Sequence, residues 1–406
     1  MNNRSFKLVG IAVVAASLAF TGCGSRTEAS SGGSAGGGSS SKVAKIGVIA
    51  PLSGDLSALG LGIRNSVDLA IRQANESNAI PGWKLELAAE DDEAKPDTGK
   101  NAATKLASDD AVVGVVGTLN SSVAQSVIPV LDSAKIVQVS PANTNPALTK
   151  GADYINSPKR PNPNYFRTCT TDAVQGPFAA QYLLGEGIKK VATIHDKKSY
   201  GQGLVSEFTK AFTAGGGEVV AAETINPDDK NFSAVISKVQ GSSPEAVYYG
   251  GEYPQAGPLS KQMKSAGLKV PLMGGDGIYS GEFIKLGGTD GDLATSVGAP
   301  VETLDSAKPF VDGYKAAGFS EGYEAYGAYS YDAATAIINA LKTSLQSASD
   351  AKSARQATID AMAKVNFQGA TGTVGFDEFG DSVSRVLTVY AVTNGAYAPK
   401  KTGELK

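Results

Sequence analysis

The sequence predicts an α/β protein built from two doubly wound parallel-sheet lobes. From Lys45 onward, short β-branched runs alternate with helical patterns, which is typical of parallel strands joined by crossover helices. This series occurs twice without close repetition of sequence, which favours two similar lobes over a solenoid. About 365 of the 406 residues follow the N-terminal segment, more than one core usually holds.

The first 22 residues have the pattern of a secretory signal. Arg4 and Lys7 precede an uncharged stretch over residues 8–20, which is shorter than the roughly 20 residues of a spanning helix. The segment Thr21-Gly22-Cys23 resembles the lipobox of bacterial lipoproteins, in which the cysteine becomes the lipid-bearing N-terminus. We therefore expect residues 1–22 to be a lipoprotein signal peptide and Cys23 to be lipidated. A plain secretory signal is the alternative.

Residues 23–42 are mostly Ser, Gly and Ala, which cannot bury enough apolar surface to offset the entropy of ordering. A flexible coil of this length reaches roughly 24 Å on average. We expect a tether that holds a soluble body close to a membrane.

The first series of elements starts at Lys45. Its predicted strands cover residues 45–50, 84–90, 112–117 and 135–140, and its predicted helices cover residues 62–75, 98–107 and 121–134. Pro129 lies inside the last helix, where it would cause a kink or an early end.

The second series starts near Gly176. Helices are predicted over residues 176–187, 200–216, 232–240 and 257–267, and strands over residues 189–195, 218–225, 246–251 and 271–275. After Pro300 the sequence predicts helices over residues 307–318, 328–345 and 354–365, then strand-like runs over residues 371–380 and 386–397.

Composition argues against several classes of function. The chain has 37 basic and 40 acidic residues, a net charge of −3 and no basic stripe, so we expect no nucleic-acid partner. Its one histidine, His195, excludes a His-rich metal site, and we expect it to be a hydrogen-bonded residue at a strand end. Besides Cys23 the chain has only Cys169, which we expect to be a small buried residue.

Cofactor and hydrolase motifs are weak or missing. Gly60 and Gly62 partly match a dinucleotide fingerprint, but Asn65 replaces its third glycine. The sequence has neither a phosphate-binding loop nor a G-x-S-x-G elbow. We therefore expect no cofactor, no metal and no enzymatic activity.

Small polar loops follow the predicted strands at residues 117–122, 140–146, 248–254 and 274–281. In doubly wound sheets ligands bind at the carboxyl ends of strands, so these loops should face one crevice. Ser121 opens a helix, whose terminus offers free N–H groups to an anion; a simple helix cap is the alternative role of Ser121, and the two roles are compatible. Asp276 lies in a glycine-rich loop, where its carboxylate could bind an ammonium group. Together they would suit a zwitterion.

Several strings resemble the leucine/isoleucine/valine-binding proteins, the solute receptors of ABC importers with the type I periplasmic-binding fold. The strings are SPANTNPALT, QGPFAAQYLL, IHDKKSYGQGL, KNFSAVISKVQ, VYYGGEYP and GFDEFGD, and the resemblance spans Lys45 to Ala396. It implies discontinuous lobes joined by a multi-strand hinge. Lobe 1 would comprise residues 43–171 and 301–387, and lobe 2 residues 172–300 and 388–406.

The resemblance also implies roles for individual residues. Ser121, Ala142 and Thr144 would hold the carboxylate of the ligand, and Asp276, with Gly277 beside it, would bind its α-amino group. Tyr200 would cover the ligand from the second lobe. Tyr326 would line the pocket for the ligand's side chain.

Two positions depart from the family pattern. Leu59 replaces a large aromatic residue at the pocket wall, and Glu252 stands where an aromatic residue follows YYGG, unless Tyr253 takes that role. If Glu252 and Asp276 both face the cleft, one ammonium group leaves a buried negative charge in excess, which is costly unless paired. A cationic or other polar amino acid bound through Glu252 is therefore the alternative to a branched-chain ligand.

We expect an extracytoplasmic solute-binding lipoprotein that captures a free amino acid, Leu, Ile or Val before others, and delivers it to an ABC transporter permease. Its lipid would anchor it to the cell membrane, and we expect a monomer. A sensor that shares the ligand chemistry without transport is the second alternative.

Overall fold

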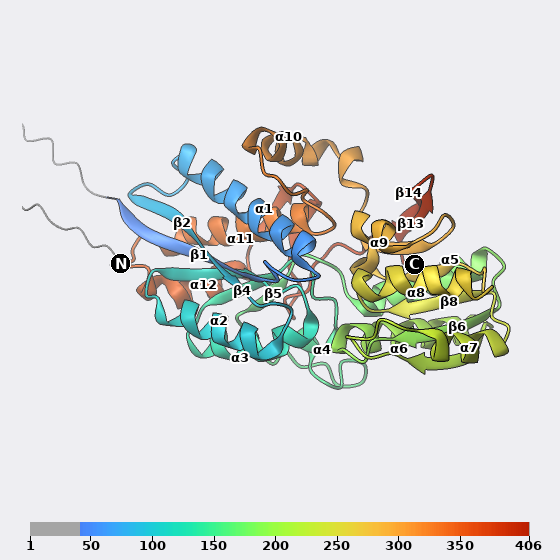
Figure 1. The fold of residues 1–406 in the computed structure, drawn as a ribbon. Coiled ribbons are helices and arrows are strands. Elements are labelled where there is room, and N and C mark those ends of the chain that lie inside the picture. Colours follow the sequence, from blue (N-terminus) through green and yellow to red (C-terminus); the bar gives the residue numbers. More distant parts are fainter. Residues whose placement is uncertain (1–40, 406) are drawn as a thin grey trace, which may run out of the picture. The chain divides into compact units, whose positions relative to one another are not determined.

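The computed structural model describes residues 41–405, which contain two large sheets with helices on both faces of each (Figure 1). The first sheet is wholly parallel, with the strand order β2-β1-β3-β4-β5. Its strands are β1 (Lys42–Ala50), β2 (Trp83–Asp91), β3 (Val112–Gly117), β4 (Val137–Ser140) and β5 (Tyr165–Arg167). The predicted signal peptide, Cys23 and residues 23–40 of the tether lie outside the described residues. β1 begins at Lys42, the residue predicted to end the tether.

Successive side chains of β1 point to opposite faces of the first sheet, and both faces carry apolar residues, so helices cover both. Ile46 and Val48 point into a core shared with α1 and α11, whereas Ile49 points into a core shared with α2 and α3. The helices on this sheet are α1 (Ser57–Glu76), α2 (Pro96–Ser108), α3 (Ser121–Ser133), α4 (Ala147–Lys150), α11 (Gly327–Ser344) and α12 (Arg355–Met362). Pro129 lies inside α3, and the helix continues through it to Ser133.

The second sheet has the strand order β14-β13-β10-β9-β8-β6-β7. Its strands are β6 (Lys190–His195), β7 (Glu218–Thr224), β8 (Ala246–Gly250), β9 (Leu272–Gly274), β10 (Leu293–Val297), β13 (Val386–Thr393) and β14 (Ala396–Glu404). Adjacent tyrosines of β8 point to opposite cores: Tyr248 packs with α5 and α6, and Tyr249 with α7 and α8. These helices are α5 (Asp172–Gly185), α6 (Ser199–Ala214), α7 (Ser233–Gly241) and α8 (Tyr253–Ser265).

The predicted α/β class with parallel sheets is confirmed, with one correction. β13 pairs antiparallel with both β10 and β14, so the second sheet is mixed. The run predicted as one strand over residues 386–397 is a hairpin that turns at Asn394-Gly395, where φ is 53° and 73°. Positive φ at both central residues is the geometry that favours Asn-Gly in two-residue hairpin turns.

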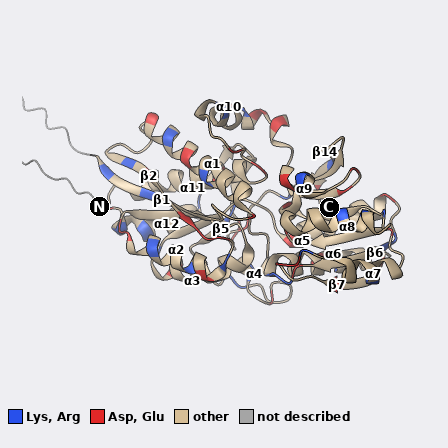
Figure 2. Ribbon diagram, in the orientation of Figure 1, with Lys and Arg blue, Asp and Glu red and all other residues tan. Residues whose placement is uncertain are grey.

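The chain passes between the sheets three times: from β5 to α5, from β10 towards α10 (Lys308–Ala317), and from β12 (Gly372–Gly375) to β13. β12 pairs with β11 (Asn366–Gly369) in a separate hairpin, and the short α9 (Gly281–Leu286) follows β9. Acidic and basic side chains are interspersed over the helices of both sheets (Figure 2), in keeping with the net charge of −3. No helix within the described residues is long and apolar enough to span a membrane.

Candidate functional site

A small cavity lies between the two sheets, at the carboxyl ends of their strands. We call it the central cavity; its lining residues are Leu59, Leu119, Asn120, Ser121, Ala142, Tyr200, Glu252, Gly277 and Tyr326. The segments that follow β1, β3 and β4 contribute from the first sheet, and those that follow β6, β8 and β9 contribute from the second; Leu59 and Tyr200 lie in the first turns of α1 and α6. Loops predicted to share one crevice therefore do so. The cavity volume is about 10 Å³, room for about one water molecule.

Most of the residues predicted to bind a ligand line this cavity. The exceptions are Asp276, which is hydrogen-bonded to Tyr200 and Tyr326, and Thr144, which lies two residues from Ala142 in the same loop. Leu119 and Asn120 also line the cavity, although neither was among the residues predicted to bind a ligand. Both lie in the predicted loop 117–122, and Asn120 directly precedes Ser121 at the start of the helix.

The first wall of the central cavity is the start of α3. Ser121 is its first residue, and Val123 and Ala124 donate their N–H groups to the Asn120 carbonyl oxygen at 3.1 and 3.0 Å. Within residues 41–405, the N–H groups of Ser121 and Ser122 have no such acceptor. A helix start with free N–H groups and a positive dipole end favours an anionic group.

One buried oxygen atom of the cavity lining, Oδ1 of Asn120, has no hydrogen-bond partner among the described residues. Asn120 is only 4% exposed. Buried polar atoms are nearly always paired, because an unpaired one forfeits its hydrogen bonds to water. This atom is therefore positioned to bond to a polar molecule in the cavity.

Asp276 is held by residues from both sheets. Its Oδ1 accepts hydrogen bonds from Nε2 of Gln175 at 3.0 Å and the hydroxyl of Tyr200 at 2.8 Å, and its Oδ2 accepts one from the hydroxyl of Tyr326 at 2.9 Å. Burial raises the pKa of Asp276, although these three hydrogen bonds oppose the shift. The site thus presents a desolvated carboxyl group that a cationic group would stabilise in its charged form.

The glycines around Asp276 are required by close approach. A Cβ atom on Gly275 would lie 2.4 Å from the Tyr200 hydroxyl, and one on Gly277 would lie 2.9 Å from the Gly251 carbonyl oxygen. The glycine-rich loop therefore allows Tyr200 to reach both the Asp276 carboxylate and the Gly277 N–H group, the latter at 3.1 Å.

Glu252 lines the central cavity, but its charge is already paired. Lys198 donates from Nζ to Oε2 at 2.9 Å, and Asn120 donates from Nδ2 to Oε1 at 2.7 Å across the two sheets. Burial by itself would raise the pKa of Glu252, but Lys198 and these hydrogen bonds lower it overall. The charge of Glu252 is therefore not in excess, because Lys198 supplies a counterion. Tyr253 points elsewhere, and its hydroxyl donates to the Asp55 carbonyl oxygen at 2.5 Å.

A second carboxyl group stands beside this ion pair. Asp196 is fully buried, and its Oδ1 accepts from the Lys198 N–H group at 3.0 Å. Burial and the nearby charge of Glu252 raise the pKa of Asp196 to about 8. Asp196 therefore keeps its proton at neutral pH, which limits repulsion between the two carboxyl groups.

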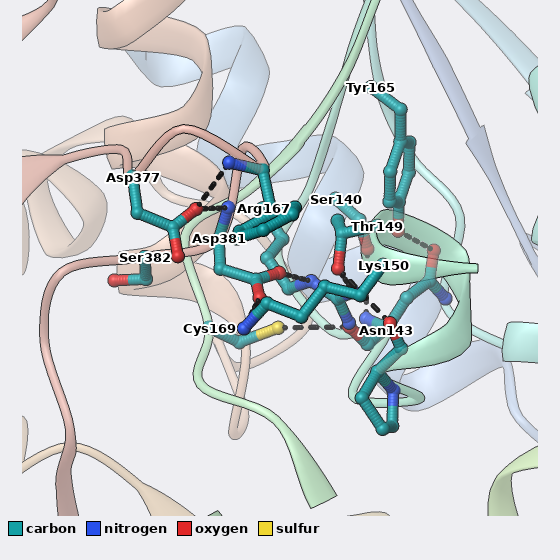
Figure 3. A network of polar contacts seen from close by, with 12 residues as sticks. Ser140, Asn143, Thr149, Lys150, Tyr165, Arg167, Cys169, Asp377, Asp381 and Ser382 are labelled. Atoms are coloured by element: carbon teal, nitrogen blue, oxygen red, sulfur yellow. Dashed lines mark hydrogen bonds and ion pairs between the residues drawn. The ribbon is translucent and has the colours of Figure 1, made fainter. Parts of the chain in front are cut away.

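The loop that carries Ala142 and Thr144 is fixed by a buried arginine (Figure 3). Nη1 of Arg167 donates to the carbonyl oxygens of Asn143 at 2.5 Å and Asn145 at 3.0 Å, the two residues that flank Thr144. The Arg167 side chain is fully buried. Its position therefore determines where the backbone of Thr144 lies.

Arg167 is held in turn by the segment that follows β12. Nε of Arg167 lies 2.8 Å from Oδ1 of Asp381, and Nζ of Lys150 lies 2.9 Å from Oδ2 of the same carboxylate (Figure 3). Burial alone would lower the pKa of Arg167, but Asp381 raises it overall. Asp381 ends the string GFDEFGD, which the sequence analysis used only for its resemblance to a family. Its contact shows that this string supports the loop of Thr144.

His195 and Cys169 lie outside the central cavity and have structural roles. His195 ends β6, and its Nδ1 accepts from the Lys197 N–H group at 3.0 Å, in line with the prediction. Cys169 is buried, also as predicted, and burial raises the pKa of its thiol. Residues 41–405 contain no group of three or more His, Cys, Asp and Glu side chains placed to hold a metal ion.

Comparisons with known proteins agree with this architecture. The family described as "Periplasmic binding protein" matches residues 43–396. The Leu/Ile/Val-binding protein homolog 3 of Brucella melitensis is 33% identical over 353 residues, which cover 86% of this chain and 91% of the relative.

Two solved structures are similar to the chain. A leucine-binding protein of Thermotoga maritima has a TM-score of 0.78 at 28% identity, with 88% of this chain and 98% of that chain covered. A branched-chain amino acid transporter substrate-binding protein of Streptococcus pneumoniae, solved in complex with isoleucine, has a TM-score of 0.78 at 26% identity, with 90% and 99% covered.

Proposed function

Because the chain belongs to the periplasmic binding protein family, we propose that it captures a free amino acid between two lobes and presents it to the permease of an ABC importer. The relatives are a homolog of Leu/Ile/Val-binding proteins, a leucine-binding protein and a protein solved in complex with isoleucine, which supports a branched-chain ligand here. Binding and release involve no covalent step, so the protein acts as a receptor and not as an enzyme.

The observation that carries this proposal is the pairing of opposite binding features around one cavity. On the side of the first sheet, the free N–H groups at the start of α3 suit a carboxylate. On the other side, Asp276 is bonded to the lining residues Tyr200 and Tyr326 and suits an ammonium group. A free amino acid carries both groups. Leu59 and Tyr326 leave its side chain an apolar wall.

The lobes in this proposal are residues 43–171 with 301–387, and 172–300 with 388–406. Contacts between them support a closed form: Asn120 bonds to Glu252 at 2.7 Å, Tyr326 to Asp276 at 2.9 Å, and Asn145 to Ser199 at 3.0 Å. A cavity of about 10 Å³ does not admit an amino acid, so the lobes must part for entry. The ligand then contacts both lobes and favours closure around itself.

The expected affinity follows from these contacts. Hydrogen bonds to charged groups contribute about 1.5 to 3 kcal/mol each. Three or four of them, after the cost of association, support micromolar binding near −8 kcal/mol.

The cationic alternative through Glu252 loses its main support, because Lys198 already neutralises that carboxylate. A sensor without transport would share the same ligand chemistry. Neighbouring permease genes would separate the sensor from the transport receptor.

We further propose that Cys23 carries lipid and that residues 23–42 tether a monomeric receptor outside the cytoplasm. Replacement of Cys23 by Ser should release the protein from the membrane fraction without changing its ligand affinity. Retention of the variant in the membrane fraction would refute the lipid anchor.

The function is tested by a thermal-shift panel of the free amino acids. A ligand at 100 times its dissociation constant adds about 2.7 kcal/mol to the free energy of unfolding, which such an assay detects easily. Stabilisation by Leu, Ile or Val is the expected result. A response confined to Arg, Lys or ornithine would overturn the branched-chain assignment, and no response to any amino acid would overturn the function.

A further inference from the structure

A second and larger cavity lies where the chain crosses from β10 towards α10. Its volume is about 500 Å³, within the range of small-molecule sites. Its walls come from β10, β13, β14, α9 and the segments 299–302 and 322–325. We call it the hinge cavity, because the segment 299–302 belongs to one of the three connections between the sheets.

Tyrosine rings form much of the wall of the hinge cavity. The ring centroid of Tyr279 lies 4.2 Å from that of Tyr390 and 5.0 Å from that of Tyr397. Tyr390 and Tyr397 are 6.4 Å apart, with an interplanar angle of 78°. Tyr323 and Tyr329 also line the cavity. Rings in several orientations present both faces and edges, and the negative face of an aromatic ring attracts a cation.

The charged residues in the wall of the hinge cavity also favour a positively charged ligand. Glu302 and Glu324 both line the hinge cavity. Lys285 is the only basic residue among the described lining residues, and Glu282 already pairs with it at 2.7 Å. Glu324 is partly buried and accepts a single hydrogen bond, from the Ser280 hydroxyl at 3.0 Å. The cavity therefore has an excess of negative charge beside aromatic rings.

We propose that the hinge cavity binds a small organic ammonium compound, a quaternary or primary ammonium group that carries an apolar or aromatic substituent. The ammonium group lies against the tyrosine rings and the carboxylates of Glu302 and Glu324. The apolar part fills the space beside Ile284 and Val301, which also line the cavity. This ligand is distinct from the amino acid of the central cavity.

The two cavities are linked through short stretches of chain. Ser280 and Glu324, which are bonded across the wall of the hinge cavity, lie four residues from Asp276 and two from Tyr326. A ligand that contacts segments of both lobes shifts the balance between open and closed forms, provided that the proposed function holds. The factor by which the ligand of the hinge cavity changes the affinity for the amino acid must then equal the factor by which the amino acid changes the affinity for that ligand.

Choline and its neutral isostere 3,3-dimethylbutan-1-ol provide the test, since they differ in shape very little and in charge completely. Both are titrated into the full-length protein and followed by calorimetry, with and without saturating leucine. We expect choline to bind at least tenfold more tightly than the alcohol, and to bind in both conditions. Equal affinities would overturn the ammonium assignment. Complete loss of choline binding at saturating leucine would also overturn it, because this is the result expected if both compounds compete for the central cavity.

Variants locate the site. Glu302→Gln and Glu324→Gln should each weaken choline at least fivefold and leave the alcohol unchanged, whereas Glu218→Gln, an exposed acid on β7, should change neither. Glu302 is exposed, so its variant should fold normally. Asp276→Asn should leave choline binding unchanged. Loss of choline binding in that variant would assign choline to the central cavity and refute a second site. Failure of leucine to bind would count against leucine as the ligand of the central cavity and would leave the second site unaffected.

Discussion

Replacement of Asp276 by Asn tests the proposed ammonium site most directly. Asn has the shape of Asp and keeps one oxygen to accept from Tyr200 and Gln175, whose donors lie 2.8 and 3.0 Å from Oδ1. The variant removes the negative charge, and with it the attraction for an α-ammonium group. The change is therefore confined to charge at a buried position.

The expected loss of affinity follows from the burial of Asp276. Truncating one partner of a buried, hydrogen-bonded charge pair costs about 2 to 5 kcal/mol. At 1.4 kcal/mol for each factor of ten, this corresponds to a loss of affinity of roughly 30-fold to several thousand-fold. A micromolar ligand would then bind in the range of tens of micromolar to millimolar.

The stability of the ligand-free protein should change in the opposite direction. Burial raises the pKa of Asp276 above 3.8, so its carboxyl group contributes stability that is fully present below that value and lost as pH rises through the folded pKa. Asn has no charge to desolvate. At pH 8 the melting temperature of the ligand-free variant should equal or exceed that of the wild type.

Calorimetric titration with leucine and thermal melts without ligand measure both effects. Asp312→Asn removes an exposed carboxylate on α10 and serves as the matched control. A leucine affinity within threefold of the wild type would refute the role of Asp276. A ligand-free variant that melts well below the control at pH 8 would show that the Asp276 carboxylate stabilises the fold, which is the opposite of the expected effect.

Three further predictions concern the surroundings of the central cavity. Glu252→Gln leaves Lys198 without its counterion at 2.9 Å, so leucine affinity should fall about tenfold or more; calorimetry that instead shows unchanged binding would exclude this pair from the site. Arg167→Leu leaves the buried Asp381 uncompensated on that side and should lower the free energy of unfolding in urea by about 3 to 5 kcal/mol, whereas a loss below 1 kcal/mol would contradict the structural role. Asp196→Asn should flatten the pH dependence of stability, because the raised pKa of Asp196, about 8, makes the wild type lose stability as pH rises from about 4 to 8; parallel curves for both proteins would disprove this.

Local sequence patterns predicted most of the elements and the order of the loops, but not the short strands β5 and β10. Alternation of β-branched runs and helical stretches predicted β1, β3 and β6 closely, because each pattern depends on residues a few positions apart. The loops after β3, β4, β8 and β9 were predicted to meet, because the carboxyl ends of parallel strands share one edge of a sheet. The hairpin of β13 and β14 was missed, although Asn394-Gly395 carried its signal.

The sequence patterns thus determined the fold class and the loops that face the central cavity, and the resemblance to a known family supplied most of the residues that line it. Only the tertiary structure decided which charges are neutralised there. The sequence left open whether Glu252 is paired, because its partners Lys198 and Asn120 lie 54 and 132 residues away along the chain. Arg167 and Asp381 gained their role in the same way. Electrostatic interactions depend on distance in space and on burial, and neither quantity can be read from the spacing of residues along the chain.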